Sequence, residues 1–484
     1  MTAPLWTAQE IASATGGEAR AGFAADGVSI DSRSIKPGEL FVALKDARDG
    51  HDFVADSLAR GAAGALVSRV PDGVPEDAPL IVVSESLQGL RDMAAAARAR
   101  CGAKVVAVTG SVGKTSAKEM LRVALGAQGR VHAAEKSFNN HWGVPLTLAR
   151  MPRDADYAAI EIGMNHAGEI RPLARLTRPH AAVVTTVAAV HLENFSSEAG
   201  IAFAKAEILE GLEPGGAAIL PRDNPHFARL ARRARRLGVS RLLRFGAAPR
   251  AHARLLGARV GPGGTVCDAR ILGRRVHFKL GAPGRHMAMN AVAVLLAAEA
   301  VGADLARAAL ALGAFGAPAG RGETWRIGLG EGGDEGAILL IDESYNANPT
   351  SVGAAFEVLA AAQPEHGVGR VARGRRVAML GDMLELGPQE AALHAGLAGV
   401  EALASIDKVH CCGPLMRVLH EALPREKRGL WEKDSARLAE RVPRLLDAGD
   451  AVMVKGSLGA RMARVVEAVR ALGAPAPVRG EEDG

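Results

Sequence analysis

The sequence contains few aromatic residues and few cysteines. Aromatic side chains make up 4% of the 484 residues, while alanine and glycine are abundant, which favours helix packing through small side chains. The four cysteines include no CxxC pair, so they give no sign of a disulfide framework. Adjacent Cys411 and Cys412 fall in an apolar run that is typical of a buried strand. We therefore expect a reduced protein of the cytoplasm.

Long apolar runs are missing as well. No charge-free run reaches membrane-spanning length, and the start MTAPLWTAQE has no basic region before an apolar core. We therefore expect neither an integral membrane segment nor a signal peptide. The formal net charge of +6, from 59 basic and 53 acidic residues, is modest and does not predict a nucleic-acid partner. An arginine run over residues 229–250 is typical of a solvated helix face.

Apolar runs alternate with helical segments, which predicts an α/β protein of three domains and a tail. We expect a small α/β domain over residues 1–100 and a central domain with a mainly parallel sheet over residues 101–317. Residues 318–472 have the pattern of a doubly wound, Rossmann-like domain. The Pro- and acid-rich residues 473–484 are expected to be disordered. The glycine-rich residues 257–284 interrupt the central pattern, which predicts a small satellite element.

The segment KVVAVTGSVGKTSAKEM, residues 104–120, has the order strand, glycine turn, helix. In that order, backbone N–H groups and the positive end of the helix dipole converge on a phosphate. Lys114 would neutralise the β- and γ-phosphates of ATP, and the Thr115 hydroxyl would ligate Mg²⁺. Val108 stands where the long form of this motif has its first glycine, so the chain has a shorter TGSxGKT form. The rest of the predicted nucleotide loop is Gly110, Ser111, Val112, Gly113 and Ser116.

Three further residues are candidates for chemistry beside this loop. Glu161 ends an apolar run, where a parallel sheet places a magnesium ligand, and a surface or capping acid is the alternative. His191 follows another apolar run and would ligate a metal or orient a substrate, although a lone histidine is more often structural. Lys205 falls on a predicted helix, and its spacing alone favours a surface lysine paired with an acid such as Glu207.

Two polar clusters also follow apolar segments. The first contains Asn139 and Asn140, and the second contains Asn165 and His166. Uncharged amides beside a phosphate site would contact a sugar or a peptide, and ordinary turn chemistry explains them equally well. The sequence leaves both interpretations open.

Several segments follow one another in a specific order over most of the chain. They are TGSVGKTS, KSFNNHWGVPLTLARM, IEIGMNHAGEI, AAVHLENFSSEAGIAFAKAEI, GRHMAMNAV, DESYNANPTS, LGDMLELG and VKGS. Together with DSRSIKPGELFVAL near the N-terminus, they carry a match over residues 28–465, and over this range the chain resembles the Mur ligases of bacterial cell-wall synthesis. The resemblance implies a UDP-sugar-binding domain, a central ATP-binding domain and a C-terminal ligase domain.

The resemblance also implies roles around the metal. Glu161 and His191 match magnesium ligands of the family. Lys205 matches a lysine that CO₂ carbamylates, which turns a cation into a carboxylate-like anion that would help to hold a second Mg²⁺. The metal and catalytic set implied in this way is Lys114, Thr115, Glu161, His191 and carbamylated Lys205.

Further residues would contact the nucleotide and the acceptor. Asn290 would contact adenine and Arg321 would reach the nucleotide from a hinge, and Ser32 and Arg33 lie in the segment that would bind UDP. The third domain would close over ATP with Asp342, Glu343 and Asn346. The chain departs from the family pattern at Met287, Glu343 and Leu458, which replace an asparagine, an aspartate and an arginine.

The DSYNANP-like and GDMLELG-like segments are most similar to the family branch that joins D-alanyl-D-alanine to UDP-MurNAc-tripeptide. The implied reaction is ATP-driven amide formation through an acyl phosphate, with ATP and Mg²⁺, in a cytoplasmic monomer without a nucleic-acid partner. One alternative is another amide ligase, such as a MurE-like enzyme or a folylpolyglutamate synthase. A different class is a P-loop regulator or nucleic-acid-binding ATPase, which only the arginine run favours. The third residue of the acceptor peptide, diaminopimelate or lysine, stays open.

Overall fold

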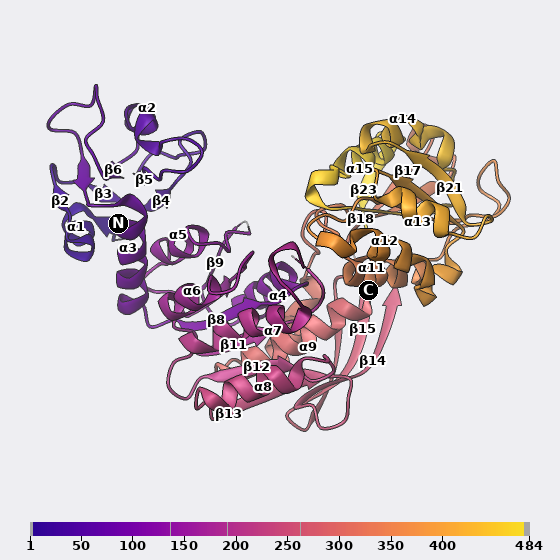
Figure 1. The fold of residues 1–484 in the computed structure, drawn as a ribbon, viewed down its shortest axis with the longest axis horizontal. Helices are drawn as coiled ribbons and strands as arrows, with labels where there is room; N and C mark the ends of the chain where they lie inside the picture. The colour runs from indigo at the N-terminus through magenta and orange to yellow at the C-terminus, as the bar shows by residue number, and fades with distance from the viewer. Residues whose placement is uncertain (1–2, 136, 191, 262, 479–484) are drawn as a thin grey trace.

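The computed structural model describes residues 3–135, 137–190, 192–261 and 263–478, which form three α/β lobes (Figure 1). The first lobe, in indigo, and the third, in orange to yellow, stand at opposite ends of the middle lobe. The expected α/β architecture is therefore confirmed. The boundary at residue 100 stays a prediction, because helix α3 (Ser86–Arg100) packs against strands of the first lobe and helices of the second.

A five-stranded sheet in the order β2-β7-β6-β5-β4 forms the first lobe. Short β-branched and aliphatic runs form its parallel strands, and Leu40, Leu66 and Ile81 from three of them are fully buried. The remaining elements are a small ribbon of β1 and β3 and the helices around the sheet. The bounds are β1 (Trp6–Thr7), β2 (Glu18–Ala19), β3 (Ala24–Ala25), β4 (Gly27–Ser29), β5 (Glu39–Val42), β6 (Gly64–Val67), β7 (Leu80–Val82), α1 (Ala8–Thr15) and α2 (Val54–Ala59).

The first lobe is anchored to the second through Trp6. Its indole nitrogen donates a hydrogen bond to the Ala149 carbonyl over 2.8 Å, and the guanidinium of Arg100 stacks 3.6 Å from the ring centroid. Leu146 and Ala149 of α5 (Gly143–Ala149) belong to the same buried cluster as the first sheet. The two lobes therefore share part of one apolar core.

A nine-stranded sheet in the order β16-β15-β14-β13-β12-β11-β8-β10-β9 forms the middle lobe. Neighbouring strands from β14 to β9 are parallel, as the sequence predicts for this domain. The strands are β8 (Lys104–Thr109), β9 (Val131–Ala133), β10 (Tyr157–Glu161), β11 (Ala181–Val184), β12 (Ala217–Pro221), β13 (Arg241–Gly246), β14 (Ala253–Gly261), β15 (Gly264–Ile271) and β16 (Arg274–Leu280). The helices are α4 (Lys114–Gly126), α6 (Ile170–Thr177), α7 (Glu198–Lys205), α8 (Phe227–Arg236), α9 (Arg285–Ala300) and α10 (Leu305–Ala311).

Helices cover both faces of this sheet because the central strand β8 is apolar on both sides. Val106 and Val108 point into a core with α4 and α9, whereas Val105 and Ala107 point into a core with α5 to α8. Between the exposed Lys104 at its start and Thr109 at its end, this strand has no polar side chain. The polar residues that follow β8 are therefore concentrated at one edge of the sheet.

Two expectations for the middle lobe are wrong. Residues 257–284 form no satellite element, because β14 pairs with β13 and extends the sheet with the antiparallel strands β15 and β16. Alternating small residues such as Cys267 and Ala269 are buried in the main core, which holds this hairpin on the sheet. The arginine run forms an exposed helix face only in α8; its second half is β13, whose Phe245 is buried.

The third lobe is the expected doubly wound domain, with a sheet in the order β21-β20-β19-β22-β18-β17-β23. Helix α11 begins as the sequence predicts, with Asn348 as its N-cap and Pro349 in its first turn. The strands are β17 (Glu323–Gly328), β18 (Ala337–Glu343), β19 (Arg376–Gly381), β20 (Lys408–Cys412), β21 (Arg428–Glu432), β22 (Ala451–Lys455) and β23 (Ala474–Pro477). The helices are α11 (Pro349–Ala361), α12 (Glu390–Gly396), α13 (Met416–Ala422), α14 (Ser435–Leu445) and α15 (Ala463–Arg470).

The expected disorder of residues 473–484 is wrong over β23. Residues 474–477 pair antiparallel with β17, although all four side chains are exposed. Backbone pairing with an edge strand needs no apolar face, which explains why composition gave no sign of it. None of the helices in the described ranges is long and apolar enough to cross a bilayer.

We predict that ending the chain at Gly473 lowers the melting temperature by a few degrees. The deletion removes β23, leaves β17 as an unpaired edge and uncovers the half-buried Trp325. A loss of about 1 kcal/mol shifts the melting temperature by roughly 2–4 °C in a domain of this size. Calorimetry of both chains measures the shift. A chain that ends at Val478 keeps β23 and is the control. Equal melting temperatures for the full-length chain and the two shortened chains would contradict the pairing of β23 with β17.

Candidate active site

The loop between β8 and α4 is shaped by two glycines. Gly110 has a φ of +154° and Gly113 a φ of +83°, backbone conformations that residues with a Cβ rarely adopt. A Cβ on Gly113 would lie 2.5 Å from the Asn290 side-chain nitrogen, and a Cβ on Gly110 would overlap Thr185. Thr185 also donates a hydrogen bond to the Val112 carbonyl over 2.6 Å. The loop is therefore tightly packed between β11 and α9.

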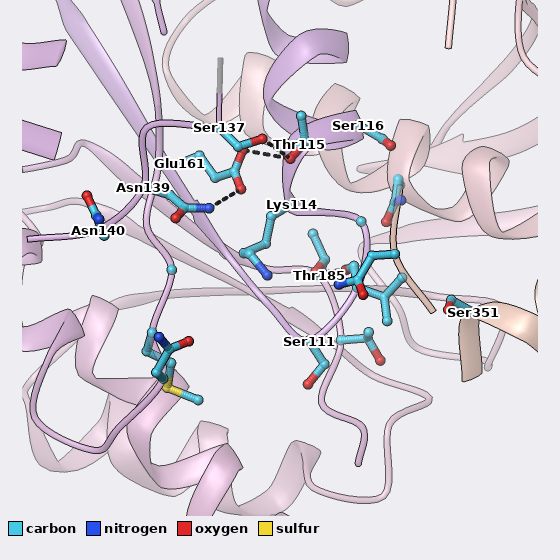
Figure 2. A pocket seen from close by; sticks show the side chains of 18 of the residues that line it. Ser111, Lys114, Thr115, Ser116, Ser137, Asn139, Asn140, Glu161, Thr185 and Ser351 are labelled. Carbon is cyan, nitrogen blue, oxygen red and sulfur yellow. Dashed lines mark hydrogen bonds between the residues drawn. The ribbon is translucent and has the colours of Figure 1, made fainter. Parts of the chain in front are cut away.

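Glu161 and Thr115 meet at the start of α4 (Figure 2). The Thr115 hydroxyl donates to the Glu161 carboxylate over 2.9 Å, and the Asn139 amide donates to its other oxygen over 2.7 Å. The Ser137 hydroxyl lies 3.3 Å from that of Thr115. Glu161 is buried at the end of β10, so the alternative of a surface acid is excluded. A cluster of oxygen atoms thus lies beside the phosphate loop.

Lys114 points from the first turn of α4 into the same site. Its ammonium donates to the Gly110 carbonyl over 2.8 Å, so it bends back over the loop. Burial lowers the pKa of Lys114, the charge of Glu161 raises it, and that of Arg321 lowers it further. Arg321 precedes the third lobe and also lines the cavity, so a cation from each of two lobes lies along its wall.

Lys205, at the end of α7, is 2% exposed, which rules out the surface lysine that its spacing favoured. Its proposed partner Glu207 instead accepts hydrogen bonds from the backbone N–H groups of Gly168 and Arg171. Among the described residues, no acid lies within ion-pairing distance of the Lys205 amine. Burial and the nearby charge of Lys114 hold the pKa of Lys205 well below its usual value. His191 lies outside the described residues.

The third lobe contributes a second charged group. Lys455, at the end of β22, is 3.0 Å from the Glu343 carboxylate and donates to the Asn346 carbonyl over 2.9 Å. The Arg321 guanidinium lies 4.0 Å from the centroid of the Tyr345 ring. The Glu343 carboxylate that replaces the family's aspartate is thus held by a buried ion pair.

One cavity of 1540 Å³ joins these groups across the three lobes. Of the predicted residues, those lining it are Ser111, Val112, Gly113, Lys114, Thr115, Ser116, Asn139, Asn140, Glu161, Asn165, His166, Asn290, Arg321, Glu343 and Asn346. Lys205 is buried behind this surface, and Asp342 accepts a hydrogen bond from the Ser344 backbone instead of lining it. Ser32 and Arg33 lie elsewhere in the first lobe, where Arg33 pairs with Asp31 over 2.9 Å.

Sequence reasoning missed several residues of this site. Lys118 is 1% exposed and donates to the Ala134 carbonyl and to Glu119, which ties α4 to the segment leading to Ser137 and Asn139. Lys118 lies four residues after Lys114 in the same helix, which places both on one helix face. This spacing could have identified Lys118 from the sequence. His286 has a buried ring nitrogen without a partner in the described chain and also lines the cavity.

Comparisons with known proteins agree with this architecture. The Mur ligase middle domain matches residues 108–298, and the domain described as "Mur ligase, glutamate ligase domain" matches residues 331–458. UDP-N-acetylmuramoyl-tripeptide–D-alanyl-D-alanine ligase of Escherichia coli (strain K12) is 37% identical over 451 residues, which cover 92% of this chain and 94% of that ligase. The chain belongs to the MurF family of Mur ligases.

Solved MurF structures share the arrangement of all three lobes. MurF from Acinetobacter baumannii superimposes with a TM-score of 0.82 at 26% identity, covering 96% of this chain and 99% of that one. MurF from Thermotoga maritima in complex with ADP gives a TM-score of 0.75 at 25% identity, covering 92% and 97%. The chain is thus an ATP-dependent ligase by family, and the predicted resemblance is confirmed.

We predict that Gly113→Ala abolishes nucleotide binding while the protein still folds. A residue with a Cβ disfavours the positive φ of this position, and its Cβ would also clash with the Asn290 side chain. The loop must therefore change its conformation, and its N–H groups would no longer converge on phosphate. Titration calorimetry with ADP measures the loss. Gly126→Ala, at the other end of α4, is the matched control, because its Cβ would meet only the Val131 side chain at 4.0 Å. ADP affinity equal to wild type in Gly113→Ala would contradict the assignment of the loop.

Proposed function

We propose that this chain joins D-alanyl-D-alanine to UDP-MurNAc-tripeptide and hydrolyses ATP to ADP and phosphate to drive the reaction. The observation that carries the proposal is the convergence of Lys114, Thr115 and Glu161 in a cavity that all three lobes line. The E. coli relative, matched over nearly its full length, is named for this activity. The alternatives differ from this reaction in substrate, so an assay of substrate dependence separates them.

ATP would bind between the middle and third lobes. Its phosphates would lie on the loop of residues 110–116, where the first N–H groups of α4 face the cavity. Asn290 and Arg321 would contact the nucleoside side, and the Glu343–Lys455 pair and Asn346 would close over it. Support comes from the similar MurF of Thermotoga maritima, whose crystal structure is a complex with ADP.

The residues of the site fit a Mg²⁺ ion. Thr115 and Glu161 supply a hydroxyl and a carboxylate 2.9 Å apart, and Mg²⁺ prefers such oxygen ligands. In the described ranges, no three acids, histidines or cysteines gather as a metal site, so the ion would also depend on phosphate oxygens. When bound, the ion would neutralise phosphate charge and orient the γ-phosphate. His191 remains a predicted ligand.

The reaction would proceed in two displacements. The terminal carboxylate of the tripeptide attacks the γ-phosphorus, the bond to the β–γ bridging oxygen breaks, and ADP leaves. The amine of D-alanyl-D-alanine then attacks the carbonyl carbon of the acyl phosphate, phosphate leaves, and the nitrogen loses a proton. Two anions must approach in the first step, so Lys114 supplies the positive charge that this approach needs. Asn139 holds the Glu161 carboxylate in place.

Lys205 would act as a carbamate. Its nitrogen attacks the carbon of CO₂, an N–C bond forms and a proton is lost, which leaves an anion beside Lys114. Its support is the burial of Lys205 without a paired acid among the described residues, next to another lysine. An anion there would attract Lys114 and Mg²⁺, whereas an ammonium would repel both.

We also propose a cytoplasmic monomer. All four cysteines are free thiols, which suits a reducing compartment such as the cytoplasm. The monomer stays a prediction.

We predict that Lys114→Ala reduces turnover by at least about 10², because one preorganised charge contact is worth that much in rate. The measurement is phosphate release that requires both UDP-MurNAc-tripeptide and D-alanyl-D-alanine. Lys104→Ala, at the exposed opposite end of β8, is the control and should keep wild-type activity. Wild-type protein that releases phosphate only with a single amino acid, a folate or a nucleic acid would refute the proposed function.

We predict that Lys205→Ala also loses most activity and that added short carboxylates restore part of it, because they replace the missing anion. Wild-type activity should depend on bicarbonate when CO₂ is depleted from the buffer. Lys205→Arg is the decisive comparison, since it keeps a positive charge and cannot form this adduct. Wild-type turnover in Lys205→Arg would exclude the carbamate.

A further inference from the structure

The cavity continues beyond the phosphate loop to helix α3. Gln88, Arg91, Asp92 and Ala95 line it, and their spacing of three to four residues places them on one face of the helix. The opposite face, with Leu90 and Met93, is buried in the core of the first lobe. Figure 1 shows α3 running from the first lobe down to the middle lobe. This helix therefore brings the first lobe to the wall of the active-site cavity.

Arg91 on this face has an unusual environment. It is half-buried, and it makes no hydrogen bond, ion pair or ring contact with any residue that the structure describes. Asp92 beside it is also half-buried and accepts a hydrogen bond from the Gln88 amide over 2.9 Å, which fixes its carboxylate. One cation and one oriented anion thus face the cavity side by side.

The other charged side chains of this wall are already engaged. Glu169 accepts a hydrogen bond from the Asn165 backbone over 2.8 Å and pairs with His166. Arg175 pairs with Glu210 over 3.1 Å. Arg91 and Asp92 are consequently the pair that is available to a ligand.

The proposed reaction determines which part of the substrate passes here, and the present inference rests on it. The reacting carboxylate of the acceptor must reach Lys114 and Glu161, while its nucleotide end belongs to the first lobe. The peptide therefore crosses the wall that α3 forms between these points. Its third residue carries the reacting carboxylate, so the side chain of that residue projects close to the phosphate loop.

We propose that Arg91 and Asp92 bind the side-chain end of the third acceptor residue and select one that carries both an amine and a carboxylate. Diaminopimelate ends in such a zwitterion, whereas lysine ends in an amine alone. Asp92 pairs with the ammonium of either residue, and Arg91 pairs with the carboxylate that only diaminopimelate has.

The test compares two acceptors that differ in this single carboxylate. Wild-type enzyme should have a higher kcat/KM for the diaminopimelate tripeptide than for the lysine tripeptide. Arg91→Gln should reduce the ratio of these two values by about tenfold or more, mainly through KM, because a charge-assisted hydrogen bond is lost. Arg91→Lys should recover part of the ratio. Asp92→Asn should raise KM for both acceptors and keep their ratio.

Arg229→Gln, on the exposed face of α8 and away from the cavity, is the matched control and should match wild type in both values. Equal losses for both acceptors in Arg91→Gln would leave their ratio unchanged and show that Arg91 binds a group they share. Wild-type kcat/KM for both acceptors would show that Arg91 binds neither. Each result overturns the inference. Failure of the proposed function looks different, because wild-type enzyme would then use neither tripeptide with D-alanyl-D-alanine.

Discussion

The main constraint on this site is electrostatic, and it comes from two lysines and one carboxylate at the carboxyl edge of one sheet. Lys114 and Lys205 are close enough for the charge of one to lower the pKa of the other, and Lys205 is fully buried. Two ammonium groups cannot share a dry site without a large electrostatic cost. The proposed carbamate on Lys205 would remove that conflict, since it would replace repulsion of Lys114 by attraction and add oxygen atoms that can ligate a metal. An anion on Lys205 would also favour the binding of Mg²⁺, and it would favour the charged form of Lys114, which would bind phosphate.

The geometry of the loop depends on neighbours that are distant in sequence. Gly110 and Gly113 allow Thr185 and Asn290 to approach the backbone, and Lys118 secures the segment that carries Asn139. Side chains just after β11 and on α9 thus fix a loop that belongs to β8 and α4, and α4 in turn holds the residues after β9. Such preorganisation would let the proposed site hold phosphate charge without reorganising during the reaction.

The sequence predicted features formed by neighbouring residues, but it did not predict which distant segments pair with one another. The phosphate loop, the acid at the end of β10 and the Asn348 cap follow from residues that are adjacent along the chain. The hairpin of β15 and β16 and the strand β23 were missed because sheet edges are completed by backbone pairing, which composition does not encode. The burial of Lys205 was missed for a related reason, since a lysine at a helix end is ordinarily exposed.

Helix α3 brings the first lobe to the cavity and would give it a direct part in binding the acceptor. One face is fixed in the core of the first lobe, its C-terminal Arg100 stacks on Trp6, and Trp6 is hydrogen-bonded to the middle lobe. The helix is therefore held at a fixed position relative to the phosphate loop, whereas the third lobe contributes residues across the hinge at Arg321. An acceptor held along α3 would have its reacting carboxylate positioned before the third lobe closes over ATP. Recognition of the acceptor would then depend on the rigid side of the cavity, and closure would complete only the nucleotide side.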